Sequence, residues 1–171
     1  MDFQLLSTPI GKLRLRATGE ALIAVDHVNQ QTAPLADWVE ATANPILQQA
    51  IAELNEYFAG ERTEFEIPLS PLGTPFQLSV WNALRTVPYG KTATYTDIAE
   101  IIGNKKAVRA IGAANGRNPL SIFIPCHRVI GKSGKLVGYA GGLHIKTILL
   151  DLEQNSQGSG IFSESLHLTR S

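Results

Sequence analysis

The chain has a single cysteine, Cys126, which limits how its fold can be stabilised. One thiol cannot close an internal disulfide, and it cannot build a cysteine-rich zinc site or a Cys-x-x-Cys redox centre. Stability must come from a hydrophobic core, which 171 residues with 44% hydrophobic and 18% charged residues can supply. This length fits one ordinary domain, or two small lobes packed as a unit.

No stretch of the chain predicts a membrane span or a secretory leader. The longest apolar runs, residues 21–25 and 122–124, are far shorter than the roughly 20 residues that a span needs. Residues 1–4 lack the basic start and the apolar stretch of a signal peptide. We therefore expect a cytoplasmic protein.

Charge is segregated along a chain whose net charge is zero. Residues 85–146 hold ten Lys and Arg against two Asp and Glu, a net charge of +8, which leaves −8 for the rest. This asymmetry favours a polyanion-binding lobe on an acidic support. A solvated basic face without a partner explains the charge alone equally well.

The first part of the chain predicts a small α/β lobe over residues 1–70. Apolar residues alternate with polar ones between turn signals, as expected for antiparallel strands. Asn44 can cap a helix, Pro45 suits its first turn, and Gly60 lies just beyond its end. The turn-rich residues 70–73 suggest a lobe boundary. The expected elements are a small antiparallel sheet, an irregular stretch with a short helix near Trp38, a helix and a further strand, over residues 1–25, 26–44, 45–58 and 65–69.

The second part, residues 73–153, predicts a mostly helical lobe. Thr74 and Gln77 form a capping-box pattern, and Thr94 with Asp97 in the first turn marks another helix start. A glycine-containing turn joins that helix to the next, which is a helix-turn-helix pattern. We expect helices that start at 75 and 95, helices over 106–115 and 143–152, a strand over 121–124, and a mobile tail over 154–171.

The second helix of the helix-turn-helix carries mostly small side chains. Ala110, Gly112 and Ala113 crowd around Arg109, whereas a major-groove reader presents long polar side chains to the base edges. A helix with small side chains and one arginine fits a shallow groove better, where an inserted side chain can wedge between bases. A tightly packed internal helix is the alternative.

Cys126 is followed directly by His127 and Arg128 in a basic segment. A lone cysteine is most often a small buried hydrophobe, but positive charge or a histidine lowers the pKa of a thiol and favours the nucleophilic thiolate. In an extended strand the two neighbouring side chains would point to opposite faces, which favours a contact relayed by water. The histidine would then need an orienting carboxylate. Glu153 is the best candidate and Asp151 the competing one.

A glycine-rich segment, residues 138–142, lies between the cysteine and these carboxylates. Glycines allow a loop to fold closely over a substrate, and Tyr139 could then form a pocket wall. An ordinary glycine-rich turn is the plainer alternative.

These motifs together resemble the methylated-DNA–protein-cysteine methyltransferases, also called O6-alkylguanine-DNA alkyltransferases. Ile124-Pro125-Cys126-His127-Arg128-Val129 is similar to the active-site signature of that family. The similarity runs in one register from about residue 73 to 153, and the N-terminal pattern at residues 8–11 is much less specific. The other matching segments are 73–77, 80–81, 87–90, 94–95, 107–110, 118–119, 138–142 and Lys146.

The resemblance implies an α/β (α+β) fold, with a ribonuclease-H-like N-terminal lobe that holds an antiparallel sheet and a mostly helical lobe that binds DNA. It implies that Cys126 irreversibly takes a methyl or other alkyl group from the O6 of a damaged guanine, so that each protein molecule acts once. His127 would deprotonate the cysteine through a water, and Glu153 would orient His127. Tyr139 would assist proton transfer to the guanine.

The resemblance also implies roles around this centre. Asn118 would join the helix-turn-helix to the active-site strand, Tyr95 would rotate the target phosphate, and Arg109 would fill the hole left by the flipped base. The expected partner is double-stranded DNA with O6-alkylguanine, bound by a monomer without metal or cofactor. Alkyl size, activity on O4-alkylthymine and cooperativity on DNA stay open. We assign further DNA contacts to Ala110, Gly112, Ala113, Arg117 and Arg128.

Two features depart from the family pattern. Residues 147–154 lack a tryptophan and a glycine that many relatives have there, although Glu153 stays in register. The single cysteine also means that the structural zinc site found in the first lobe of some relatives is absent.

Two other classes of protein stay open. A cysteine hydrolase with a Cys126–His127–Glu153 triad would turn over an ester or a peptide, although the adjacency of the first two residues argues against it. A DNA-binding regulator or damage sensor would bind without transfer. Sensors of this family lack the reactive cysteine, and a regulator would need a dimerisation element, which the sequence does not show.

Overall fold

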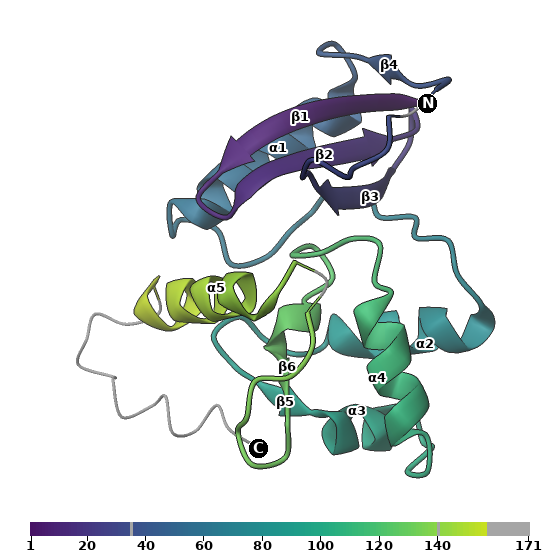
Figure 1. Ribbon diagram of the computed structural model, residues 1–171, viewed down its shortest axis with the longest axis vertical. Coiled ribbons are helices and arrows are strands. Elements are labelled where there is room, and N and C mark those ends of the chain that lie inside the picture. The colour runs from purple at the N-terminus through teal and green to yellow at the C-terminus, as the bar shows by residue number, and fades with distance from the viewer. Residues whose placement is uncertain (35, 140, 157–171) are drawn as a thin grey trace. The chain divides into compact units, whose positions relative to one another are not determined.

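The computed structural model describes residues 1–34, 36–139 and 141–156. They form two compact units, which divide between Leu72 and Gly73. The fold is α/β, with a sheet-containing N-terminal unit and a mostly helical C-terminal unit, as the sequence predicts (Figure 1).

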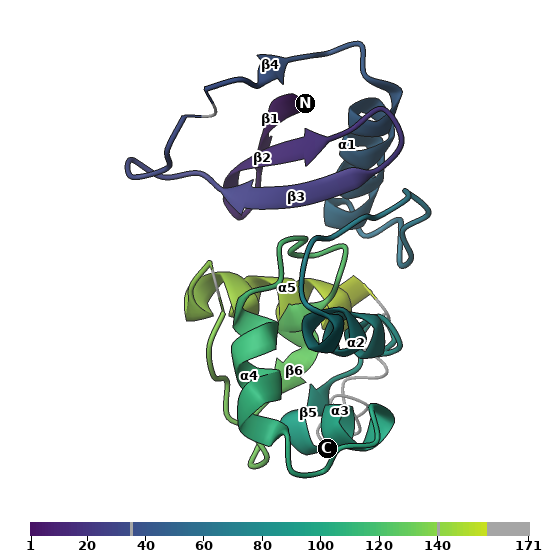
Figure 2. The same cartoon turned by 90° about the vertical axis from the view of Figure 1, so that its right-hand side faces the viewer.

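The N-terminal unit is a four-stranded sheet with one helix against it. The strand order is β3-β2-β1-β4, with β1 (Asp2–Thr8), β2 (Gly11–Ala17) and β3 (Leu22–His27) antiparallel and β4 (Val39–Glu40) parallel to β1. Alternate residues of β2 are fully buried, because successive side chains of a strand point to opposite faces. Helix α1 (Pro45–Phe58) covers one face of β1, β2 and β3 (Figure 2).

Two predictions for this unit are wrong. Trp38 does not start a helix but precedes β4, and the guanidinium of Arg16 lies 5.3 Å from the centre of its ring. The strand expected over 65–69 is reduced to a bridge between Leu69 and Leu22. The backbone N–H groups of residues 66 and 67 donate instead to the buried carboxylate of Glu53 on α1, which takes the place of a strand partner.

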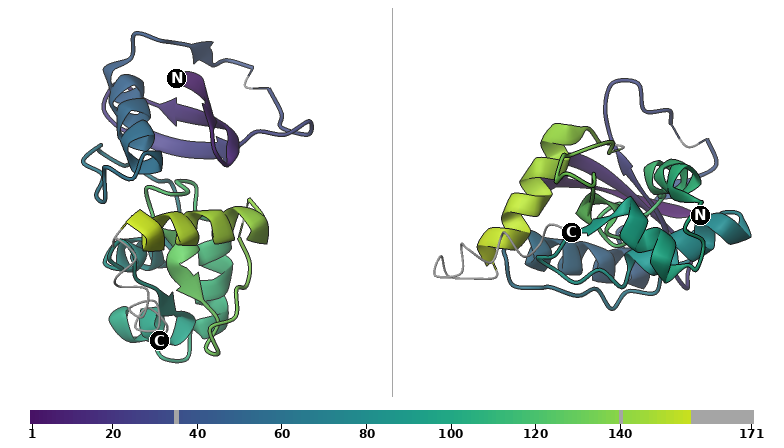
Figure 3. Two further views of the ribbon diagram at one scale, coloured as in Figure 1. Left: turned by 90° about the vertical axis from the view of Figure 1, so that its left-hand side faces the viewer. Right: turned by 90° about the horizontal axis from the view of Figure 1, so that it is seen from below.

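The C-terminal unit packs helices around a two-stranded parallel ribbon, β5 (Ala93–Thr94) and β6 (Val129–Ile130). Helices α2 (Pro75–Leu84), α3 (Tyr95–Ile101) and α4 (Val108–Gly116) contact one another, and α3 and α4 form the helix-turn-helix. Helix α5 (Leu143–Ser156) lies against the turn that precedes β6 (Figure 3). The capping boxes predicted at Thr74 and Thr94 are both formed.

Two predictions for the C-terminal unit also need correction. Residues 121–124 form no strand, because Ser121 and Ile124 pair in a single bridge and Ile122 between them has a φ of 78°. A β-branched residue seldom adopts this left-handed conformation, and the burial of Ile122 holds it there. Helix α5 runs to Ser156, so the predicted tail starts too early, and residues 157–171 lie outside the described residues.

Candidate active site

Cys126 begins a short 3-10 turn, η1 (Cys126–Arg128), and does not lie in the extended strand expected from the sequence. Its backbone N–H donates to the carbonyl of Ile124 at 2.8 Å. The Asn118 side chain donates to the same carbonyl at 2.8 Å and accepts from the N–H of Leu120 at 2.9 Å. Asn118 therefore fastens the segment after α4 to the turn that carries the cysteine.

The environment of the Cys126 thiol favours its protonated form. The residue is 2% exposed, and burial raises the pKa of the thiol above its ordinary value. The side chains of Asn118 and Ser121 and the charge of Lys146 oppose this rise without cancelling it. Because a buried thiolate is poorly solvated, nucleophilic chemistry at this cysteine needs a nearby base.

His127, the next residue in the chain, is the candidate for that base. Its Nε2 lies 2.6 Å from Oε2 of Glu153, whereas Asp151 is exposed on α5. Burial lowers the pKa of His127, and Glu153 offsets this only in part, so the imidazole is neutral. A neutral ring that donates Nε2–H to the carboxylate has its acceptor lone pair at Nδ1. Nδ1 has no hydrogen-bond partner in the part of the chain that the structure describes.

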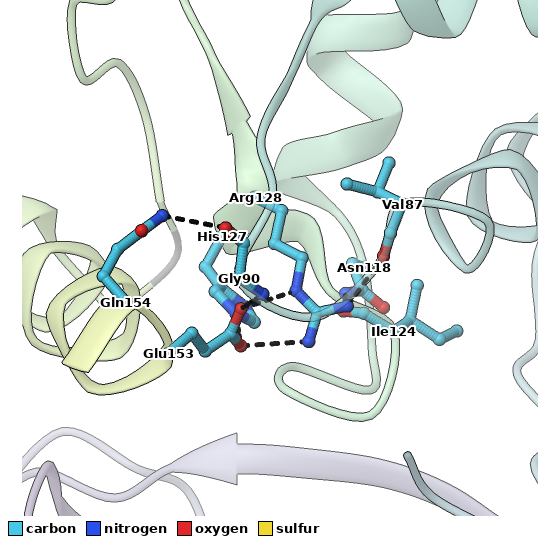
Figure 4. A network of polar contacts seen from close by, with 8 residues as sticks. All are labelled: Val87, Gly90, Asn118, Ile124, His127, Arg128, Glu153 and Gln154. Carbon is cyan, nitrogen blue, oxygen red and sulfur yellow. Dashed lines mark hydrogen bonds and ion pairs between the residues drawn. The ribbon is translucent and has the colours of Figure 1, made fainter. Parts of the chain in front are cut away.

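Arg128 completes this network with its guanidinium directed at the carboxylate of Glu153 (Figure 4). Its Nε and Nη2 donate to the two oxygens of Glu153 at 2.8 and 3.0 Å, and its Nη1 donates to the carbonyl of Val87 at 2.8 Å. The N–H of Gly90 adds a bond of 3.2 Å to the same carboxylate. Burial alone would raise the pKa of Glu153, but His127 and Arg128 hold it below its ordinary value. Glu153 is therefore a fixed anion that orients His127.

The structure contradicts the DNA contact predicted for Arg128. The residue is 6% exposed, and each of its guanidinium nitrogens bonds inside the protein. A basic residue that the sequence analysis counts toward a polyanion-binding surface instead neutralises a buried carboxylate.

Lys146 is a second buried cation, to which sequence reasoning assigned no role. Its Nζ donates to the carbonyl of Val129, to that of Val137 at 2.8 Å and to that of Gly138 at 3.4 Å. Burial lowers its pKa to about 8, and the nearby Cys126 opposes this shift. Lys146 thus ties α5 to the strand after the cysteine and to the start of the glycine-rich segment.

The sequence held a signal for these buried charges of α5. Lys146, Leu149 and Glu153 are spaced i, i+3 and i+7, which places them on one face of a helix. Leu149 marks that face as the buried one, so two charged residues share a core-facing stripe. Charges in such positions need partners, and here Arg128, His127 and backbone carbonyls provide them.

Tyr139, predicted to line the pocket, has a phenol that stays protonated. Burial and the nearby Cys126 raise its pKa, and a hydrogen bond with Ser121 opposes this rise. A protonated phenol can donate a hydrogen bond beside the thiol.

The other residues predicted to contact DNA lie on or beside α3 and α4. Arg109, Ala110 and Ala113 of α4 are exposed, and so is Arg117, which follows the helix. Tyr95 at the start of α3 is half-buried, and a Cβ added to Gly112 would lie 3.8 Å from its ring. Tyr95 and α4 therefore share one surface, and their contacts with DNA stay predictions.

Residues 1–34, 36–139 and 141–156 contain neither a candidate membrane-spanning helix nor a cluster of possible metal ligands. No helix there is both long enough and apolar enough to cross a membrane. No three His, Cys, Asp or Glu side chains there gather closely enough to hold a metal ion.

The fold and the site together define a protein with one buried cysteine, beside a histidine–carboxylate–arginine network, on a helix-turn-helix unit. Residues 75–155 match the family described as 6-O-methylguanine DNA methyltransferase, DNA binding domain, and residues 1–71 match the ribonuclease-like domain of the same family. The chain therefore belongs to the 6-O-methylguanine DNA methyltransferase family, which confirms the resemblance seen in the sequence.

Individual relatives are similar to this chain over nearly their whole length. The methylated-DNA–protein-cysteine methyltransferase of Methanosarcina acetivorans is 48% identical over 155 residues, which are 90% of this chain and 98% of the relative. The constitutive methylated-DNA–protein-cysteine methyltransferase of Bacillus subtilis is 49% identical over 156 residues, 87% of this chain and 93% of the relative. The crystal structure of Mycobacterium tuberculosis OGT in complex with DNA has a TM-score of 0.85 and 44% identity, and the match covers 91% of this chain and 94% of that chain.

Proposed function

We propose that this protein repairs DNA by direct reversal of damage, as a methylated-DNA–protein-cysteine S-methyltransferase. It moves a methyl or other alkyl group from the O6 of an alkylated guanine in double-stranded DNA to Sγ of its own Cys126. The observation that carries this proposal is the buried network of His127, Glu153 and Arg128 beside the only cysteine of a chain in this family. It supplies a neutral imidazole on the residue that follows the cysteine, and a fixed anion that orients this imidazole.

The chemistry begins with removal of the thiol proton. Nδ1 of His127 takes this proton through one water, and the ionised Glu153 stabilises the imidazolium that forms. The thiolate attacks the alkyl carbon, so that an S–C bond forms, the O6–C bond breaks and the electron pair stays on the guanine. Tyr139 passes a proton to the base and regains one from the imidazolium, so the thiol proton ends on guanine. The product is a stable thioether, and each molecule acts once.

The substrate atom lies inside the duplex, so the damaged base has to leave the stack. Arg109, exposed on a face of α4 with small neighbours, fills the space that the base leaves, and Tyr95 turns the adjacent phosphate. Basic residues of this unit give affinity that depends on salt and not on sequence. We expect a monomer that acts in the cytoplasm, without metal or cofactor.

The first test is the mass of the intact protein after incubation with a duplex that contains one O6-methylguanine. We expect a stoichiometric gain of one methyl group on Cys126, and no gain in the Cys126→Ser variant. Tight binding without a change in mass would instead indicate a damage sensor. Neither binding nor transfer would reopen the cysteine hydrolase class.

A further inference from the structure

Asn115 is a buried polar residue that the mechanism above does not use. It is the penultimate residue of α4 and is 4% exposed. Its Nδ2 donates to the carbonyl oxygen of Cys126 at 3.4 Å. Its Oδ1 is also buried and has no hydrogen-bond partner within the described residues. Because an unpaired buried acceptor destabilises a fold, a residue that only filled this space would be better apolar.

The Asn115 side chain also reaches the DNA-facing surface from inside. Burial and the nearby Cys126 raise the pKa of Tyr95, and a hydrogen bond with Asn115 opposes this rise. Tyr95 starts α3, and Asn115 lies on the same helix as Arg109. One buried amide therefore connects both helices of the helix-turn-helix to the backbone of the nucleophile.

Asn115 acts together with Asn118, three residues further on. Asn118 donates to the carbonyl of Ile124, and Asn115 donates to that of Cys126, so the two amides hold carbonyls on either side of Pro125. The shape of this turn decides where the thiol points. One of these amides, Asn115, lies in the last turn of the helix that carries Arg109, and the other, Asn118, lies two residues beyond the end of that helix.

We infer that Asn115 is a positioning residue for alkyl transfer, which links α4 and Tyr95 to the carbonyl of Cys126 so that the helix-turn-helix and the nucleophile keep one geometry. The inference rests on the proposed function. Because Asn115 is buried, its loss should leave affinity for DNA unchanged and slow the transfer itself. A misplacement of about 1 Å costs up to roughly a hundredfold in rate when reacting atoms must be aligned.

The test is single-turnover methyl transfer from a duplex with one O6-methylguanine, measured over a range of protein concentrations for the wild type and Asn115→Leu. Leu has a similar volume but no hydrogen-bonding group. We expect the rate at saturation to fall about tenfold or more, with the dissociation constant within about twofold of the wild type. The matched control is Asn82→Leu, which changes an exposed asparagine of α2 and should keep the wild-type rate.

Each outcome decides the inference. A wild-type saturated rate in Asn115→Leu overturns the inference. A lower saturated rate that is accompanied by losses of both DNA affinity and melting temperature also overturns it, because this pattern marks a purely structural residue. If Asn115→Leu does not fold, Asn115→Ser decides: a slower rate with unchanged affinity supports the inference, and an unchanged rate overturns it. A wild type that transfers no methyl group overturns the proposed function itself, which separates that failure from a failure of Asn115.

Discussion

Arg128 determines what the carboxylate of Glu153 can do. Without the guanidinium, the buried anion would lose a cationic partner and keep a neutral imidazole and the N–H of Gly90, so its charge would be costly. With it, Glu153 stays ionised and holds the proton of His127 at Nε2, which leaves Nδ1 free to accept. The catalytic use of His127 therefore depends on Arg128, which acts through the carboxylate of Glu153.

Replacement of Arg128 tests this dependence through stability. Arg128→Met leaves a buried carboxylate without its main partner, so we expect the free energy of unfolding to fall by about 3–5 kcal/mol. Arg117→Met removes an exposed arginine and should change it by less than about 0.5 kcal/mol. Urea denaturation of both variants measures the difference. Equal stability of the two would show that the buried pair is not a stabilising contact.

The same network predicts how stability depends on pH. The pKa of His127 and that of Glu153 are both lower in the folded protein than their ordinary values. As the pH falls, the unfolded chain therefore binds protons before the folded protein does, and the free energy of unfolding decreases from about pH 7 to about pH 3. Glu153→Gln removes the carboxyl contribution and should flatten the curve below about pH 5. Urea denaturation at a series of pH values gives both curves, and identical slopes would contradict the assignment.

At the scale of elements, the helix starts could be predicted because their determinants are local. Asn44, Thr74 and Thr94 each accept N–H groups within three residues of their own position. The turn around Cys126 could not be predicted in this way. Its form depends on the amides of Asn115 in α4 and Asn118 just after it, and on a left-handed Ile122 that only tertiary packing maintains.

The site residues also divide into those that the local sequence predicts and those that only tertiary contacts reveal. Cys126, His127 and Glu153 could be named from the sequence, through neighbouring residues and the family pattern. The internal role of Arg128 could not, because its partner Glu153 lies 25 residues away and exposed and buried arginines look alike in a sequence.

The start of α2 depends on Gly73 for a reason of space. A Cβ at this position would lie 2.5 Å from the ring of Trp81, which is buried and donates to the carbonyl of Ala114 at 2.9 Å. We expect Gly73→Ala to lower the free energy of unfolding by about 1–3 kcal/mol, because the ring has no room to move. Gly116→Ala, where a Cβ would meet nothing within 4 Å, should be neutral or slightly stabilising. Thermal unfolding compares the two, and equal losses would contradict this account.

Helix α4 makes its own prediction through Arg109. If this residue fills the space of the flipped base, Arg109→Ala should still bind duplex DNA while methyl transfer slows by about tenfold or more. A single-stranded oligonucleotide with the same lesion is the matched substrate, because its base need not leave a duplex, and both proteins should act on it equally. Single-turnover rates on the two substrates measure this. Equal rates on the duplex would exclude the proposed role.

At the scale of the whole molecule, the reaction adds atoms to a closed interior. Cys126 is 2% exposed, and residues 120–130 around it are all buried. A methyl group on Sγ must displace its neighbours, so we expect the methylated protein to be less stable by about 1–3 kcal/mol. Melting curves after incubation with methylated or unmethylated duplex measure this directly. A melting temperature that does not fall would show that the pocket already has room for the product.

Because the chain has a single thiol, the state of that thiol shows whether a given molecule has already reacted. A chain with many cysteines would mix spent and unspent sites in any thiol assay, whereas here one thiol corresponds to one molecule. Titration of denatured protein with a thiol reagent therefore counts the molecules that have not reacted. Subtracted from the total, this number gives the lesions repaired, so a sample of the protein serves as its own dosimeter for alkylation.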